Sequence, residues 1–224
     1  MEFDSFVLAA ATADLDEEPA ARGDADAVEF RMDLADRPQA QLDGYDGDLP
    51  LVVTNRAEWE GGEATAAEAA RLDALVTAAD HEAVEAVDVE LESLRTAAGE
   101  ETAAAVRDRG ASVVASVHDF EATPPRDRLT AMLEEAAERG DVGKLAVTAS
   151  DRDDALALLS ATHAATRRGD DVATMAMGEA GRHTRAVSPV YGSKIGYAPV
   201  DPAKATAPGQ YDLSTLATLV DRLS

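Results

Sequence analysis

Short apolar runs alternate with longer amphipathic stretches from one end of the chain to the other. Eight of the runs are five to seven residues long and rich in aliphatic side chains, which is typical of buried β-strands. They cover residues 5–11, 27–32, 49–55, 86–90, 112–118, 142–148, 172–177 and 192–197. Because helix-like stretches separate these runs, the pattern favours repeated β-α units and a parallel sheet.

The stretches between the runs carry apolar residues at helical spacing. This spacing predicts helices most clearly over residues 65–79, 100–109, 125–139, 151–168 and 213–223, and least clearly after the first, second and seventh runs. Gly110, Gly140 and Gly169 mark the expected ends of three helices. Eight alternations without a linker predict an α/β protein with a (β/α)8 TIM barrel, in a single domain over residues 1–224.

A doubly wound open sheet is the structural alternative to the barrel. That fold needs a glycine-rich phosphate loop after the first strand, and the sequence AAATADLDEE at this place contains no glycine. The chain therefore favours the barrel.

The charge of the chain is strongly negative, at −24, from 44 acidic and 20 basic residues. A field of this sign repels nucleic acids and anionic membranes, so neither is an expected partner. The acidic residues are dispersed, and Lys144, Lys194 and Lys204 are the only lysines. Dispersed acids with scarce lysine suit concentrated salt, where repulsion is screened within about 3 Å at 1 M. The composition predicts a halophilic protein.

Several classes of protein are excluded by residues that the chain lacks. It contains no cysteine, which rules out disulfides and thiolate zinc sites, and its four histidines show no metal-ligand spacing. The N-terminal sequence has no basic segment before its apolar run, so it does not resemble a signal peptide. No apolar run approaches the roughly 20 residues that span a membrane. We therefore expect a soluble cytoplasmic protein without a metal.

Polar or sulfur-containing side chains occur on nearly every predicted strand, where an apolar barrel would not need them. They are Glu29 and Arg31, Thr54 to Arg56, Asp88 and Glu90, Ser116 to Phe120, Lys144, and Met175 and Met177. Alternation along a strand puts the members of each pair on one face. Any single pair could be a structural ion pair or core methionines. Their convergence at the carboxyl ends of barrel strands predicts an active site.

Lys144 lies within the apolar run DVGKLAVT, which begins at Asp141. A buried ammonium is costly to desolvate, and a neutral amine is a nucleophile toward ketones. The alternative is a strand-end lysine that extends to solvent, and Lys194 is the rival nucleophile.

His118 ends the fifth strand, beside the sixth strand in a barrel, and is the expected proton carrier. We expect His163 and His183 at the surface.

Taken in order, these blocks resemble those of type I 3-dehydroquinate dehydratase of the shikimate pathway, a (β/α)8 barrel that acts through a lysine Schiff base. The matching blocks are EFRMD from Glu29, TNRAEWEGG from Thr54, DVEL from Asp88, SVHDF from Ser116, KLAV from Lys144, MAMGEAGRHTR from Met175 and APGQ from Ala207. The resemblance implies that 3-dehydroquinate condenses with Lys144, that His118 transfers protons and that Glu60 orients His118. It also implies that Arg185 binds the substrate carboxylate. The remaining implied substrate contacts are Glu29, Arg31, Arg56, Thr206, Gln210, Met175 and Met177.

The chain departs from the family pattern at two places. Thr206 stands where the family commonly has serine, and Ala9 to Ala11 stand where the first strand often has one. Which of Asp88 and Glu90 reaches the site stays open. The loop from Gly178 to Arg185 is a candidate flap, a homodimer is expected, and no organic cofactor is implied. The rival functions are a class I aldolase acting on a sugar phosphate and a non-catalytic barrel that binds a small anion.

Overall fold

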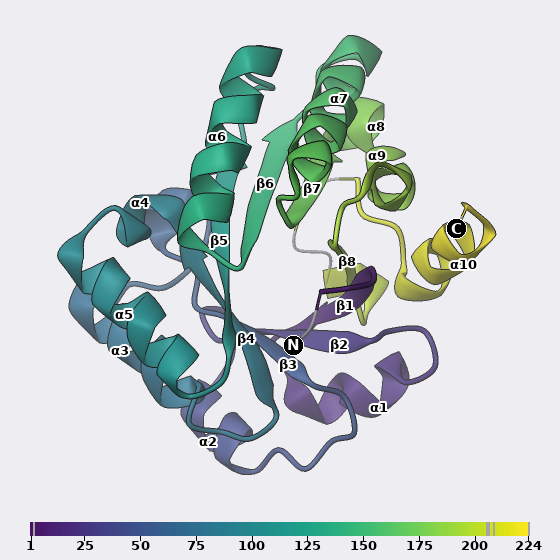
Figure 1. Ribbon diagram of the computed structural model, residues 1–224. Helices are drawn as coiled ribbons and strands as arrows, with labels where there is room; N and C mark the ends of the chain where they lie inside the picture. The colour runs from purple at the N-terminus through teal and green to yellow at the C-terminus, as the bar shows by residue number, and fades with distance from the viewer. Residues whose placement is uncertain (2, 205–206, 208, 224) are drawn as a thin grey trace.

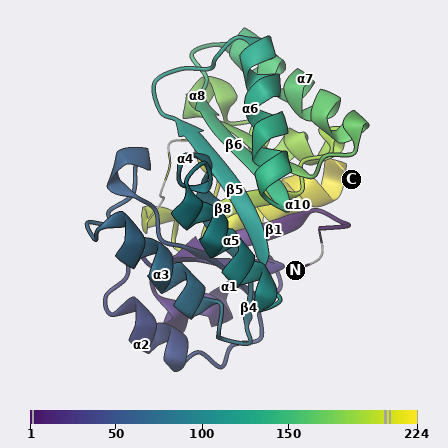
Figure 2. The ribbon, with the colours of Figure 1, turned by 60° about the vertical axis from the view of Figure 1, so that its left-hand side comes forward.

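The computed structural model describes residues 1, 3–204, 207 and 209–223. Within these residues, eight parallel strands form the centre of the molecule and helices lie around them (Figures 1 and 2). The strands are β1 (Val7–Thr12), β2 (Ala27–Arg31), β3 (Leu51–Thr54), β4 (Val84–Glu90), β5 (Ser112–Asp119), β6 (Val142–Thr148), β7 (Val172–Met177) and β8 (Ile195–Pro199). Seven of the eight predicted runs agree with these bounds to within two residues.

The sheet closes into a nearly complete barrel. Its strand order is β7-β6-β5-β4-β3-β2-β1-β8, and β8 pairs in parallel with β1. The remaining seam is bridged where Val172 pairs with Ser193 and where the Lys194 amide donates to the Val172 carbonyl at 2.7 Å. The prediction of a (β/α)8 barrel is confirmed, and the doubly wound open sheet is wrong.

The longer helices agree with the predicted amphipathic stretches. They are α3 (Glu68–Ala78), α5 (Ala97–Asp108), α6 (Arg126–Arg139), α7 (Arg152–Arg168) and α10 (Leu213–Leu223). Gly110 and Gly169 follow α5 and α7 with φ of 86° and 95°, a left-handed conformation that glycine adopts without strain. The other helical elements are short: α1 (Glu18–Ala21), α2 (Pro38–Asp43), α4 (Leu91–Leu94), α8 (Gly178–Gly181), α9 (Thr184–Val187), and the 3-10 helices Leu15–Glu17, Glu58–Glu60, Ser188–Tyr191 and Pro202–Lys204.

Two predictions for the last third of the chain are wrong. The eighth strand begins at Ile195 instead of residue 192, because the 3-10 helix Ser188–Tyr191 continues to Gly192, whose φ of 96° ends it. The segment from Gly178 to Arg185, expected as a loop, folds largely into α8 and α9. It is held against β7 because the Thr184 hydroxyl accepts a hydrogen bond from the Ala176 amide at 2.8 Å.

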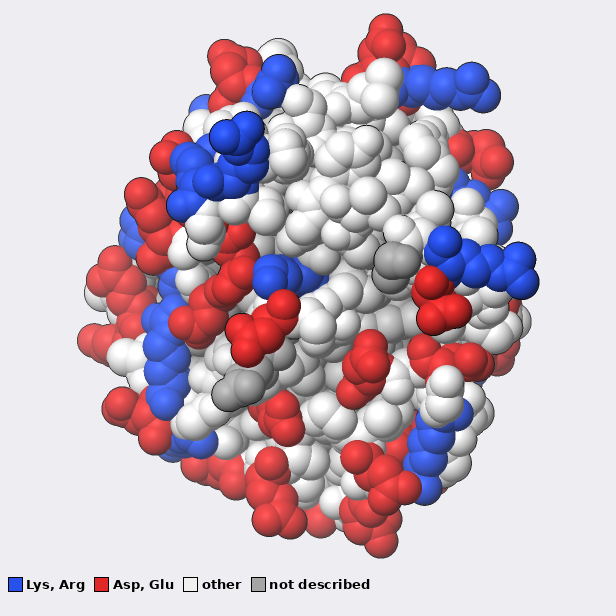
Figure 3. Space-filling view, turned by 45° about the vertical axis from the view of Figure 1, so that its right-hand side comes forward, with Lys and Arg blue, Asp and Glu red and all other residues white. Residues whose placement is uncertain are grey.

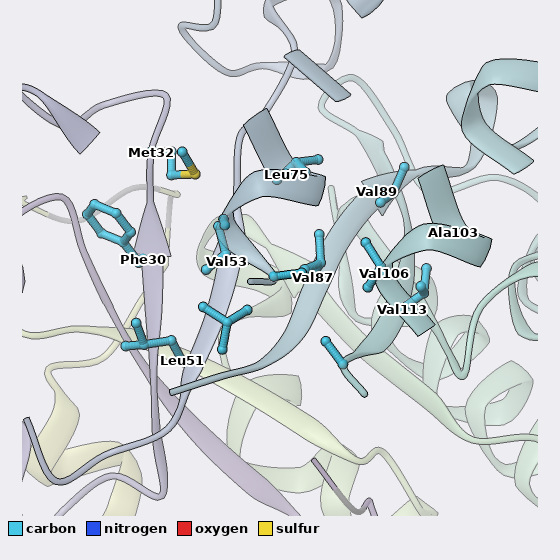
Figure 4. Packing of buried hydrophobic residues seen from close by; sticks show 14 of the residues in the cluster. Phe30, Met32, Leu51, Val53, Leu75, Val87, Val89, Ala103, Val106 and Val113 are labelled. Carbon is cyan, nitrogen blue, oxygen red and sulfur yellow. The ribbon is translucent and has the colours of Figure 1, made fainter. Parts of the chain in front are cut away.

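The core has one part outside the barrel and one part inside it. Outside, strand residues such as Val53, Val87 and Val113 pack against Leu75 of α3 and Val106 of α5 (Figure 4). Inside, the apolar residues of four strands each stand two positions before a polar residue. These pairs are Val52 and Thr54, Ala86 and Asp88, Val114 and Ser116, and Val142 and Lys144. The barrel interior is therefore apolar toward the strand starts and polar toward the carboxyl ends.

Candidate active site

One cavity at the carboxyl ends of the strands collects the predicted site residues. It encloses about 550 Å³, including its opening to solvent. Ten of the eleven predicted residues line it: Glu29, Arg31, Arg56, Glu60, His118, Lys144, Met175, Met177, Arg185 and Gln210. The eleventh, Thr206, lies outside the described residues. A volume of this size fits a small organic molecule.

Lys144 is buried, with 4% of its surface exposed, so the alternative of a lysine that extends to solvent is wrong. Its Nζ atom lies 2.9 Å from Oδ2 of Asp88, 3.7 Å from Oε1 of Glu29 and 4.2 Å from the ring centroid of Tyr197. The sequence suggested apolar surroundings for this amine. The structure instead surrounds it with two carboxylates and an aromatic face, which stabilise a positive charge at this position.

Asp88 is the acidic residue of β4 that reaches the amine. Its Oδ1 atom accepts hydrogen bonds from Arg56 Nη2 at 2.8 Å and from the Ser116 hydroxyl at 2.5 Å. Burial opposes ionisation of this carboxyl, but the cations of Arg56 and Lys144 hold its pKa well below the usual range. Asp88 is therefore a permanent anion between two cations. Glu90 points elsewhere, since its Oε1 accepts from Arg56 at 3.1 Å and from the Ala57 amide at 3.0 Å.

Beyond Glu90, the charge network continues to helix α3 outside the barrel. Nη1 of Arg71 lies 2.8 Å from Oε2 of Glu90, and both residues are at most 1% exposed. Arg71 also binds Glu68 and the Ser93 hydroxyl. Local sequence patterns do not single out Arg71, because an arginine in an amphipathic helix normally lies on the solvent face.

His118 and Glu60 form a partly buried pair at the cavity wall, with Nδ1 and Oε1 2.8 Å apart. Burial lowers the pKa of His118 well below its ordinary value, and the charges of Arg56 and Lys144 act in the same direction. Burial raises the pKa of Glu60 to about 8, against the opposing effect of Arg56. At neutral pH these shifts keep a proton on the Glu60 carboxyl and leave the His118 ring neutral, so the pair holds one proton at the cavity wall. The Phe120 ring stacks on His118 with centroids 5.8 Å apart.

Arg185 differs from the other arginines of the cavity because it has no acidic partner among the described residues. Arg31 is paired with Asp33 at 2.7 Å, and Arg56 is paired with Asp88 and Glu90. Arg185 is 3% exposed, and it forms no ion pair with any residue that the structure describes. Burial alone lowers its pKa to about 10. A buried guanidinium facing a cavity suits an anionic ligand.

The remaining predictions about lysines and histidines can also be judged. Lys194 does not line the cavity; it precedes β8 and lies 3.4 Å from Asp171 at the opposite end of the barrel, so it is rejected as the nucleophile. His163 and His183 are exposed, as expected.

Among the described residues, no group of three His, Asp or Glu side chains could hold a metal ion. None of the helices described here is long and apolar enough to cross a membrane.

A family model described as type I 3-dehydroquinase matches residues 6–223. The chain belongs to the type I 3-dehydroquinase family. A relative from Haloarcula marismortui named 3-dehydroquinate dehydratase is 63% identical over 226 residues, which cover 100% of this chain and 98% of the relative. A relative of the same name from Halobacterium salinarum is 53% identical over 223 residues and 98% of each chain. The crystal structure of 3-dehydroquinate dehydratase from Geobacillus kaustophilus is similar with a TM-score of 0.87 and 27% identity, over 98% of this chain and 91% of that one.

Membership in the type I 3-dehydroquinase family confirms the resemblance stated from the sequence blocks, together with the hydro-lyase activity that it implied. The aldolase and the non-catalytic barrel are thereby rejected. The relatives from Haloarcula and Halobacterium also agree with the halophilic composition. Sequence reasoning missed Tyr197 in the cavity wall, and it assigned no role to Thr54 and Phe120 within the blocks that it named. The signal for Tyr197 was its place in the eighth strand, two residues after Ile195.

Proposed function

We propose that this cavity converts 3-dehydroquinate to 3-dehydroshikimate through a Schiff base on Lys144, as a step of aromatic amino acid biosynthesis. The observation that carries the proposal is the position of the Lys144 side chain. All three lysines are among the described residues, and only Lys144 lines the cavity, together with His118 and Glu60. A buried amine beside a proton carrier is the arrangement that imine chemistry requires.

The reaction removes one molecule of water from a β-hydroxy ketone. The Lys144 ammonium gives a proton to His118, and the freed amine adds to the ketone carbon. The carbinolamine takes that proton back as it loses water to form an iminium. His118 takes a proton from the neighbouring carbon, and the electrons of that C–H bond form an enamine. The β-hydroxyl then leaves as water with a proton that the pair of His118 and Glu60 returns. Hydrolysis by one water molecule frees the product and Lys144.

Asp88 has an electrostatic role in this scheme. Its Oδ2 atom lies 2.9 Å from Nζ of Lys144, the nitrogen that carries the positive charge of the ammonium and, after condensation, of the iminium. A fixed anion beside a cationic intermediate lowers the barrier without reorganisation of solvent.

Arg185 is the proposed partner of the substrate carboxylate, because its buried guanidinium has two donor edges and no acidic partner in the described chain. Glu29, Arg31, Arg56 and Gln210 supply the proposed polar contacts to the ring hydroxyls, and Met175 and Met177 supply its apolar contacts. Thr206 is a further proposed substrate contact, and it lies outside the described residues.

The proposal is tested by trapping the imine. The protein is incubated with 3-dehydroquinate in molar KCl, borohydride is added, and the modified peptide is located by mass spectrometry. We expect a reduced adduct on Lys144, and neither adduct nor turnover in Lys144→Arg. The matched control is Lys194→Arg, which should keep both, because arginine can retain the contact with Asp171. An adduct on Lys194, or turnover by Lys144→Arg, would contradict the proposal.

We also propose that residues 1–224 act as one domain in a cytoplasmic homodimer. Support for the dimer comes from a broad area free of charged side chains on one face of this acidic protein (Figure 3). Helix α7 and the adjoining 3-10 helix expose Leu156, Val190 and Tyr191, of which Val190 is 58% exposed. Sedimentation equilibrium in 2 M KCl should give a dimer for the wild type and a monomer for Tyr191→Glu. A monomeric wild type would rule out the dimer.

A further inference from the structure

Tyr197 has a buried hydroxyl group that forms no hydrogen bond with any residue that the structure describes. The residue is 4% exposed and lines the cavity, and its hydroxyl has no hydrogen-bond partner among the described residues. Buried phenol groups almost always find a partner, because an unsatisfied one has lost its hydrogen bonds to water without replacement. A ligand bound in the cavity can therefore supply the hydrogen-bond partner for this hydroxyl.

Tyr45 shows what a structural tyrosine looks like in the same protein. Its hydroxyl donates to the Leu49 carbonyl at 2.6 Å, on the outer side of the barrel and away from the cavity. Tyr45 thus has a protein acceptor, whereas the described part of the chain offers none to Tyr197. The two residues form a natural pair for comparison.

The surroundings of Tyr197 keep its hydroxyl protonated and leave room beside it. Burial raises its pKa well above the ordinary value, and the charges of Glu29 and Asp88 act in the same direction. In the register between β1 and β8, Tyr197 stands opposite Ala9, whose side chain is a single methyl group. The hydroxyl is therefore a hydrogen-bond donor throughout the working range of pH.

The position of the ring relative to Lys144 indicates which part of a substrate the hydroxyl meets. Nζ lies 4.2 Å from the ring centroid, so a carbon bonded to Nζ is held above or beside the phenol ring. The nearby carboxylates are already engaged. Asp88 binds Lys144, Arg56 and Ser116, and Glu29 accepts from Thr54 at 3.0 Å.

We propose that Tyr197 is a further catalytic residue, whose hydroxyl donates a hydrogen bond to the oxygen on the substrate carbon that condenses with Lys144. This inference rests on the proposed function. As the amine adds, the C=O double bond becomes a C–O single bond, and the hydrogen bond stabilises the negative charge that develops on that oxygen. The oxygen then leaves as water with a proton from the pair of His118 and Glu60, so Tyr197 keeps its own proton.

The test compares Tyr197→Phe with Tyr45→Phe. Tyr197→Phe keeps the ring over Lys144 and removes only the donor. We expect the rate of borohydride-trapped adduct formation and kcat to fall about 10²-fold, the effect of losing one such donor. The midpoint of thermal unfolding without substrate should not fall, because the hydroxyl has no partner among the residues that the structure describes. Tyr45→Phe should show the reverse, with a lower midpoint and unchanged kcat and trapping rate.

The outcomes separate this inference from the proposed function. If the wild type neither turns over 3-dehydroquinate nor forms an adduct, the proposed function fails, and the role of Tyr197 fails with it. If the wild type is active and Tyr197→Phe traps at the same rate, only the role of Tyr197 is overturned. A higher KM with unchanged kcat would put the hydroxyl on another part of the substrate and would equally overturn the assignment.

Discussion

The Nζ atom of Lys144 lies 2.9 Å from Oδ2 of Asp88, although the strands of these residues are not neighbours. Strand β5 runs between β4 and β6, and its Ser116 donates to the same carboxylate. Arg56 binds the other oxygen at 2.8 Å from the direction of β3. One buried carboxylate thus connects four parts of the barrel wall and separates two cations.

Asp88→Asn should therefore damage both stability and activity. The variant leaves Lys144 and Arg56 buried without the anion between them, and removing one partner of a buried ion pair typically costs about 3–5 kcal/mol. We expect a loss of this size in urea unfolding, and a kcat at least about 10²-fold lower because the iminium loses its counter-charge. Asp80→Asn, which breaks an exposed pair with Arg109, is the control and should change stability by less than about 1 kcal/mol. Equal stability of the two variants would refute the argument.

Arg185→Met should stabilise the protein while it abolishes substrate binding. Burial lowers the pKa of Arg185 to about 10 from 12.5, which corresponds to a penalty of about 3 kcal/mol for holding the charge there. Removing an unpaired buried charge should therefore raise the free energy of unfolding by about 1–3 kcal/mol in the absence of substrate. The KM for 3-dehydroquinate should rise at least about 10²-fold. Arg95→Met, which removes surface ion pairs, should not stabilise the protein. A destabilised Arg185→Met variant would show that the guanidinium has a structural partner.

The parts of the fold that sequence predicted are those whose signal is local. Apolar runs located seven strands to within two residues, and alternation along them brought Lys144 and His118 into one cavity. The start of β8 was missed because the turn at Gly192 follows an apolar 3-10 helix, and the two together have the composition of a strand. Arg71 could not be found in this way. Its burial depends on meeting Glu90, 19 positions away, which no local pattern encodes.

The pair of Arg71 and Glu90 gives a prediction about stability. Arg71→Met leaves one oxygen of Glu90 buried without a cation, and we expect a loss of about 3–5 kcal/mol in urea unfolding. The double variant Arg71→Met with Glu90→Gln should recover part of this loss, because residue 90 then carries no buried negative charge and Arg56 keeps its pair with Asp88. Glu68→Gln is the control: Glu68 is half exposed, so its loss should matter little. Additive losses in the double variant would mean that the two residues are not coupled.

Salt should stabilise this protein strongly. The net charge of −24 repels itself across a surface dense in carboxylates, and molar salt reduces the range of that repulsion to about 3 Å. We expect the midpoint of thermal unfolding to rise steadily from 0.1 to 2 M KCl. Sucrose at matched osmolality serves as the control for solvent exclusion without ions. A midpoint that does not change with KCl would contradict the halophilic interpretation.

Glu60 makes the free energy of unfolding depend on pH between about 4.5 and 8. Its pKa is about 8 in the folded protein and 4.5 ordinarily, so between these values the native state holds a proton that the unfolded chain has released. Stability therefore falls as pH rises toward 8. His118 acts in the opposite sense at lower pH. It is neutral when folded and protonated when unfolded below about 6.5, so its contribution raises stability as pH increases up to that value.

The contributions of Glu60 and His118 to the free energy of unfolding oppose each other below pH 6.5. Above pH 6.5, only the contribution of Glu60 changes with pH. At 1.36 kcal/mol per proton and pH unit, we expect the free energy of unfolding to fall by about 2 kcal/mol between pH 6.5 and 8. Urea unfolding at three pH values in 2 M KCl measures the slope. Glu60→Gln cannot titrate and should be nearly flat over this range, whereas Glu58→Gln, at an exposed neighbouring position, should keep the wild-type slope. The same slope in Glu60→Gln as in the wild type would mean that Glu60 is ionised in the folded protein, and the proton shared with His118 would have to come from another group.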